Sequence, residues 1–128
     1  MQDIEKLRFA KSHEWIAPDG TVGITDHAQK EVTDVVFVEL PPLGKSAAQD
    51  GEVATLESVK AAFPINAPVA GKVSAVNDKV AKNPELINQA PYGDGWLFKL
   101  DVADAGSLKS LMTNAQYEEF LKTDAAHP

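Results

Sequence analysis

A few residues in this sequence combine side-chain types that are found in catalytic sites. His13 next to Glu14 has the composition of a general acid–base pair. Neighbouring residues on a strand point to opposite faces, however, which argues against a joint role. A Ser-His-Asp triad could be assembled from Ser12, His27 and one of many acids, but no nucleophile-elbow motif surrounds the serine. These residues alone do not identify an enzyme.

Patterns for phosphate and metal binding are also incomplete. The segment Gly44-Lys45-Ser46 ends like a phosphate-binding loop, but Glu39 occupies the position where that motif needs a glycine. The histidines His13, His27 and His127 show no metal-ligand spacing, and the sequence contains no cysteine. A surface turn and isolated histidines are the simpler interpretation.

One lysine offers a different kind of chemistry. Lys60 lies in Glu57-Ser58-Val59-Lys60-Ala61-Ala62, among small or apolar neighbours and without an opposite charge four residues away. An amine on a flexible stem can be acylated where the fold presents it outward. No Asn-Gly or Asp-Gly marks a hairpin tip here, so an unmodified surface charge stays the alternative.

The elements that would position these residues are mostly short strands. Runs of β-branched and aromatic residues, separated by Gly, Pro and Asn-Asp turn signals, predict strands over 21–25, 35–40, 53–59, 69–76 and 96–102. In the last of these, the apolar residues alternate with less apolar ones, as in a strand with one buried face. The pattern predicts an all-β sandwich or barrel-like domain with small appended helices.

Two helix starts interrupt the strands. Asp26, with Gln29 three residues later, is expected to cap a helix over 26–32. Thr113 and Gln116 form a capping-box pattern at the start of a C-terminal helix. The expected apolar face of that helix consists of Tyr117, Phe120 and Leu121. Such a face typically docks onto the body of a domain, and a partner groove is the alternative.

Length and composition limit the function further. The 128 residues suit a single domain over 1–128, and 44% hydrophobic with 24% charged residues is typical of a globular protein. A net charge of −7 argues against nucleic-acid and anionic-membrane partners. The absence of cysteine excludes disulfides, thiolate catalysis and iron–sulfur clusters. The N-terminal residues show no signal- or transit-peptide pattern, which predicts a cytoplasmic bacterial protein, or a mitochondrial-matrix one in a mature organellar form.

Seven motifs, in order along the chain, resemble those of one family. They are SHEW (12–15), GITDHAQ (23–29), VVFVELP (35–41), ESVKA (57–61), APVAG (67–71), NPELIN (83–88) and PYGDGW (91–96). The resemblance runs from about Leu7 to Leu121, nearly the whole chain. On these motifs the sequence is identified as a member of the glycine cleavage system H protein family, which are lipoyl carriers.

The resemblance implies a fold and a site. The fold is a lipoyl/biotinyl-type barrel-sandwich hybrid of two antiparallel sheets, with its core at about 20–103 and a C-terminal helical segment at about 107–123. Lys60 would lie on a hairpin turn and carry lipoic acid in amide linkage, so that redox-active sulfur arrives on a cofactor.

The resemblance also implies a cleft in which the loaded arm docks. Ser12, Glu14 and Ile24 would line it, with Glu14 pairing with the cationic amine and Ile24 packing on the aliphatic chain. Ordinary strand residues are the alternative. The segment Phe63-Pro64 stands where the family commonly has Ser-Asp, which removes one polar contact from the cleft.

The implied partners are four enzymes. The carrier would take an aminomethyl group from the pyridoxal-phosphate glycine decarboxylase to the tetrahydrofolate-dependent aminomethyltransferase, and dihydrolipoyl dehydrogenase would then reoxidise it. A lipoate-attaching enzyme would modify it first. We expect a monomer that is not itself an enzyme. Alternatives are a lipoyl or biotinyl domain of another system, an H-like protein that donates lipoyl groups to other carriers, and an unmodified scaffold.

Overall fold

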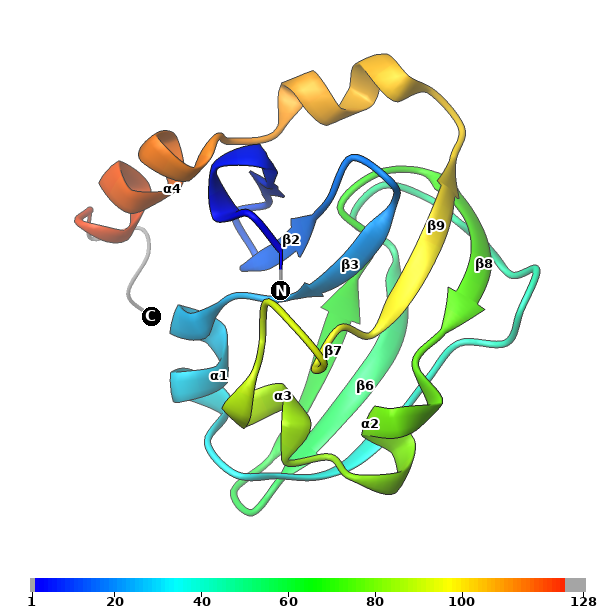
Figure 1. Ribbon diagram of the computed structural model, residues 1–128, viewed down its shortest axis with the longest axis vertical. Helices are drawn as coiled ribbons and strands as arrows, with labels where there is room; N and C mark the ends of the chain where they lie inside the picture. The colour runs from blue at the N-terminus through cyan, green and yellow to red at the C-terminus, as the bar shows by residue number, and fades with distance from the viewer. Residues whose placement is uncertain (1, 124–128) are drawn as a thin grey trace.

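Two antiparallel sheets form the frame of the computed structural model, which describes residues 2–123 (Figure 1). The six-stranded sheet contains, in spatial order, β1 (Arg8–Phe9), β2 (Glu14–Ile16), β3 (Thr21–Ile24), β9 (Phe98–Val102), β8 (Gly71–Val76) and β5 (Ser46–Ala47). The three-stranded sheet contains β4 (Val35–Glu39), β6 (Glu52–Ser58) and β7 (Ala62–Asn66). Each pair of neighbouring strands is antiparallel. The predicted fold class is confirmed.

Short helices lie at the two ends of these sheets. The α-helices are α1 (Asp26–Val32), α2 (Asp78–Lys82), α3 (Leu86–Gln89) and α4 (Asn114–Leu121), and the 3₁₀ helices are η1 (Ile4–Lys6) and η2 (Ala105–Ser110). In Figure 1, α1, α2 and α3 lie toward the end of the molecule that carries the β6–β7 turn, and the segment from η2 to α4 crosses the other end. None of the helices in residues 2–123 is long and apolar enough to cross a membrane.

The helix caps agree only in part with the predictions. Thr25, not Asp26, is the N-cap of α1, because its hydroxyl accepts the Ala28 N–H at 3.1 Å. The prediction for Asp26 was wrong by one residue: this side chain accepts a hydrogen bond from Gln29 inside the first turn. The capping box of α4 is confirmed, since Thr113 and Gln116 each bond the other's backbone N–H.

Apolar side chains gather in two clusters. The larger one lies between the sheets and includes Ile24, Leu56 and Phe98, all almost fully buried. The smaller one joins the N-terminal strands to α4, where the rings of Phe9 and Tyr117 stack with centroids 4.8 Å apart. The C-terminal helix therefore docks onto the body, as its sequence predicted.

Trp15 on β2 connects the N-terminal strands to the rest of the domain. The indole is fully buried, and its N–H points at the carbonyl oxygens of Ile24 and Pro91, at 2.9 and 3.0 Å. Its cross-strand partner is Gly23, where a β-carbon would lie 2.7 Å from the indole ring. The glycine is required because the ring lies directly on the backbone of β3.

Replacing Gly23 with alanine should therefore destabilise the protein. The added methyl group must displace a buried indole, which costs about 1–3 kcal/mol in the free energy of unfolding. Urea denaturation measures this, with Gly106→Ala as the control, because there the nearest atom is the end of the Asp104 side chain at 3.2 Å. A G23A protein as stable as G106A would contradict this account of Trp15.

Candidate functional site

The hairpin of β6 and β7 carries the lysine that the sequence singled out. The two strands pair from Glu52 and Asn66 to Glu57 and Ala62, and the Ser58 N–H donates to the Ala61 carbonyl at 2.8 Å. Only two residues then remain to connect the strands. The hairpin is thus an extension of the sheet that ends in a tight turn (Figure 1).

The Ser58 side chain holds this turn in place. Its oxygen accepts the backbone N–H groups of Lys60 and Ala61, at 3.1 and 3.2 Å. The Val59 N–H donates to the carbonyl of Asp34 at 3.1 Å, which ties the turn to the segment before β4. Asn-Gly and Asp-Gly patterns do not reveal this turn; its signal in the sequence is a serine that bonds the next backbone groups.

Lys60 is exposed at the tip of this turn. Within residues 2–123, its amine forms no ion pair with a carboxylate. Its neighbours Val59 and Ala61 are also exposed, so no bulky side chain shields the amine. A flexible amine on a rigid support suits amide attachment of a long group, and the turn therefore fits a covalently bound cofactor.

A small pocket of about 130 Å³ lies beside the hairpin, between β7, α1 and the loop before β2. Its lining residues are Ser12, His13, Ile24, Ala28, Glu31, Val32, Phe63, Pro64 and Ile65. Two of the residues predicted for a docking cleft, Ser12 and Ile24, are among them. Phe63 is three residues from Lys60, about 10 Å along a strand, so a long group on the lysine reaches the pocket.

Glu14, the third predicted residue, is not among the residues that line this pocket. Its side chain is only 2% exposed, and its two carboxyl oxygens bond the Ser12 hydroxyl and the Asn66 N–H, the latter at 3.1 Å. Burial raises the pKa of Glu14 to about 7, although these two hydrogen bonds oppose the shift. The carboxyl group links β2 of one sheet to β7 of the other.

His13 and His27 make local contacts. The His13 side chain points toward α4, where Nδ1 lies 2.7 Å from the Tyr117 hydroxyl. His13 and Glu14 therefore have different partners, but not because they alternate along a strand: His13 precedes β2 and has a φ of 75°. His27 Nε2 lies 3.8 Å from Glu31 on α1, whereas the Ser12 hydroxyl donates to Glu14. In the described part of the chain no group of acids and histidines could hold a metal ion, and His127 lies outside the described residues.

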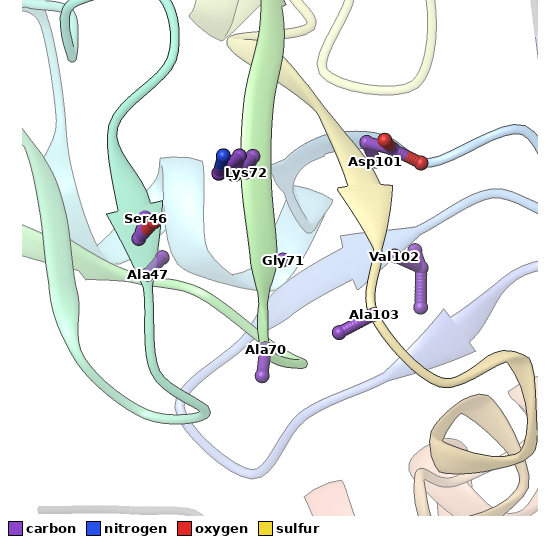
Figure 2. Close-up of a pocket in the computed structure, with 8 residues that line it drawn as sticks. All are labelled: Ser46, Ala47, Ala70, Gly71, Lys72, Asp101, Val102 and Ala103. Carbon is purple, nitrogen blue, oxygen red and sulfur yellow. The ribbon is translucent and has the colours of Figure 1, made fainter.

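A wider hollow of about 500 Å³ lies at the edge of the six-stranded sheet (Figure 2). It exists because small residues line it, including Ala47 on β5, Ala70 before β8 and Ala103 after β9. At Gly71 a β-carbon would lie 2.6 Å from the Asp101 carbonyl oxygen, so no larger residue fits there. None of its lining residues belongs to the β6–β7 hairpin, so this hollow is separate from the exposed Lys60.

The fold and this site together define a carrier domain, in which two small sheets support an exposed lysine on a rigid hairpin. The family model described as Glycine cleavage H-protein matches residues 7–124. The chain belongs to this family.

Individual relatives agree over nearly the full length. A glycine cleavage system H protein of Deinococcus deserti is 53% identical over 112 residues, which cover 88% of this chain and 92% of the relative. A mitochondrial glycine cleavage system H protein 2 of Arabidopsis thaliana is 45% identical, covering 97% of this chain and 82% of the relative. The crystal structure of a glycine cleavage system H protein from Mycobacterium marinum superposes with a TM-score of 0.83 at 31% identity, covering 93% of this chain and 98% of that one.

Membership of the family confirms the predicted function at the level of the whole protein. The chain is the lipoyl carrier of the glycine cleavage system, and proteins of this family carry lipoyl-lysine. It is a carrier subunit and not one of the enzymes.

The stability of the protein should depend on the charge of Glu14. Because folding raises the pKa from 4.5 to about 7, the native state keeps a proton that the unfolded chain loses. The stabilisation is complete below about pH 4.5 and is lost as the pH rises to about 7. In Glu14→Gln this contribution is absent. As the pH rises over that range, the free energy of unfolding of the variant should therefore rise by about 3 kcal/mol relative to that of the parent.

Urea denaturation of both proteins across this pH range measures the difference. Ser12→Ala is the matched control. It removes a hydrogen bond that lowers the Glu14 pKa, so the loss of stability should continue to higher pH in this variant. If the difference in unfolding free energy between the E14Q variant and the parent does not change with pH, Glu14 does not bind a proton on folding.

Proposed function

We propose that Lys60 is the lipoyl-bearing residue and that this chain carries the aminomethyl group of glycine. The group passes from the glycine decarboxylase to the aminomethyltransferase, and dihydrolipoyl dehydrogenase then reoxidises the carrier. The observation that supports this proposal is the exposed Lys60 on a two-residue turn that Ser58 fixes from within. When attached, the lipoyl disulfide supplies the sulfur chemistry and accepts the electrons.

The residues of this chain position the arm on Lys60 and provide a pocket beside it. The paired strands β6 and β7 hold the attachment point rigid, while the lysine stem stays flexible. Tethering keeps the carried group at a high effective concentration near each docked enzyme. The pocket at Ser12 and Ile24 is where we place the arm between two enzymes, because its mostly apolar lining limits contact with water.

Replacing Lys60 with arginine should abolish carrier function and leave the fold intact. Arginine keeps the positive charge but has no amine that forms a lipoyl amide. Intact-mass analysis after treatment with a lipoate-attaching enzyme should show one lipoyl group on the parent and none on K60R. The control is Lys72→Arg, at an exposed lysine on β8. Lipoylation of K60R, or its normal turnover with the purified enzymes, would contradict the assignment.

The outer face of the three-stranded sheet suits the docking of these enzymes. Val36 and Phe37 on β4 are 55% and 52% exposed, and Val59 beside Lys60 is 68% exposed. The cross-strand partner of Phe37 is Glu57, so acidic and apolar side chains share this face. An apolar centre with acidic neighbours favours enzymes whose matching surface is apolar with a basic rim. We propose that the monomer docks there with each enzyme in turn, in the cytoplasm.

Phe37→Ser should weaken this docking. Removing an exposed aromatic anchor next to the attachment site should lower kcat/KM for the lipoylated carrier about tenfold with at least one of the enzymes. Steady-state assays measure this, with equal lipoylation checked by mass. Leu43→Ser is the control, because Leu43 is 67% exposed but follows β4 at the end away from the hairpin. Equal losses in both variants would argue against a docking face at Phe37.

A further inference from the structure

Three basic side chains surround a hollow of about 260 Å³ at the end of the molecule away from Lys60. They are Lys6 on η1, Arg8 on β1 and Lys109 on η2, and the other lining residues are all apolar. Figure 1 shows η2 at the end of the domain opposite the β6–β7 turn. We call this hollow the basic pocket. It is lined by three cations and no acid, in a chain whose net charge is −7.

The charges of the three cations are not neutralised within residues 2–123, where every ion pair involves other residues. Lys6 and Lys109 are exposed. Arg8 is half-buried, and its Nη1 donates a hydrogen bond to the Leu111 carbonyl at 3.4 Å. That bond holds the guanidinium between β1 and the segment after η2, and it uses one of the five N–H donors of the group. The remaining donors are left for a ligand.

The acids adjacent to the pocket residues in the sequence have other partners. Asp19 forms an ion pair with Lys99 at 3.6 Å, and Glu5 accepts a hydrogen bond from Asn114 at 3.4 Å. The Asp104 carboxylate accepts a backbone N–H in the first turn of η2 and caps that helix. A carboxylate that reaches the basic pocket therefore has to come from another molecule.

The rest of the lining is apolar surface. Ile16 and Ala17 belong to the buried part of the domain, and Leu108 packs against the larger hydrophobic cluster. Ile16 is the cross-strand partner of Arg8, so these two side chains lie on the same face of the sheet. An apolar floor with a basic rim fits a ligand whose acidic groups flank an apolar one.

An inorganic phosphate fits this pocket less well than a chain of carboxylates. Phosphate sites in proteins gather backbone N–H groups, most often at a helix N-terminus or in a nest. The N-terminus of η2 is already capped, because Asp104 accepts the Gly106 N–H at 2.9 Å. The three cations come from two helices and a strand, so each can meet a different carboxylate of an extended ligand.

We propose that the basic pocket binds an acidic segment of a partner protein. An apolar side chain of that segment enters the pocket, and its carboxylates pair with Lys6, Arg8 and Lys109. The inference goes beyond the carrier function and holds whether or not Lys60 bears a lipoyl group.

The position of the basic pocket gives this contact a consequence. A protein held there leaves the β6–β7 hairpin free, because the two sites lie at opposite ends of the domain (Figure 1). The docking face proposed at Phe37 carries acidic neighbours and selects a basic partner surface. The two ends therefore select partners of opposite charge, and a contact at the basic pocket keeps the carrier at a high local concentration while its arm visits an enzyme.

The test titrates the ¹⁵N-labelled chain with the peptide Glu-Glu-Leu-Glu-Glu, acetylated and amidated at its ends. The backbone amide signals of Arg8 and Lys109 should shift, and added salt should weaken binding. In the double variant Lys6→Gln/Lys109→Gln the affinity should fall about fivefold, because two exposed ion pairs are lost. The matched control is Lys79→Gln/Lys82→Gln, which removes two exposed lysines from α2 and should bind like the parent.

Two other ligands and one further variant test the chemistry of recognition. The peptide Gln-Gln-Leu-Gln-Gln should not bind, and Arg8→Lys should bind the acidic peptide more weakly than the parent, because lysine lacks the planar fork. Equal binding of the two peptides, or equal losses in both double variants, would overturn the inference. Inorganic phosphate that shifts the same signals at lower concentration than the acidic peptide would make this a small-anion site and would also overturn it.

A last comparison separates the basic pocket from the hairpin. Saturating acidic peptide should leave the rate of Lys60 lipoylation unchanged, and Lys60→Arg should bind the peptide like the parent. Inhibited lipoylation, or lost binding in K60R, would place the peptide at the hairpin and refute the inference. A chain that binds the peptide but takes no lipoyl group would instead overturn the proposed function alone.

Discussion

The pairing of β6 with β7 is the interaction on which the site depends. It extends the three-stranded sheet into a hairpin whose inward row, Val38, Leu56 and Phe63, aligns across the strands and packs against the core. Because side chains alternate along a strand, a shift of one residue would turn this row toward solvent. The buried Leu56 therefore fixes the register, and the register leaves Lys60 in the two-residue turn.

A buried carboxyl connects this hairpin to the rest of the molecule. Glu14 joins Ser12 and β2 to the backbone of Asn66 at the far end of β7. Burying a carboxyl group is unfavourable unless it is hydrogen-bonded or protonated, and here both conditions contribute. The link holds the wall formed by Ser12 and Ile24 against β7. The walls of the pocket thus depend on the same contacts that join the two sheets.

The carrier combines a rigid hairpin with exposed side chains at and near its tip. The turn at Ser58 leaves Lys60 and Val59 in solvent, and Phe37 adds apolar surface on β4, the strand next to β6. A carrier that must meet several enzymes benefits from a small exposed patch, because each complex forms and separates readily. The net charge of −7 keeps such a patch compatible with solubility.

Local patterns in the sequence determined the features that depend on neighbouring residues. These are the alternating strand, predicted over 96–102 and observed over Phe98–Val102, the capping box of Thr113 and Gln116, and the motifs that carry the family resemblance. They missed the short strands β1 and β5 and the short helices α2 and α3, which have too few residues for a clear period. They also missed β7, which contains Pro64. Only the tertiary structure determined the hydrogen bonding of Glu14, because its partner Asn66 is 52 residues away. The same holds for the small pocket, whose lining residues Glu31 and Phe63 lie 32 positions apart in the chain. Periodicity and capping are local properties of the chain, whereas a pocket depends on distant segments packing at a definite register.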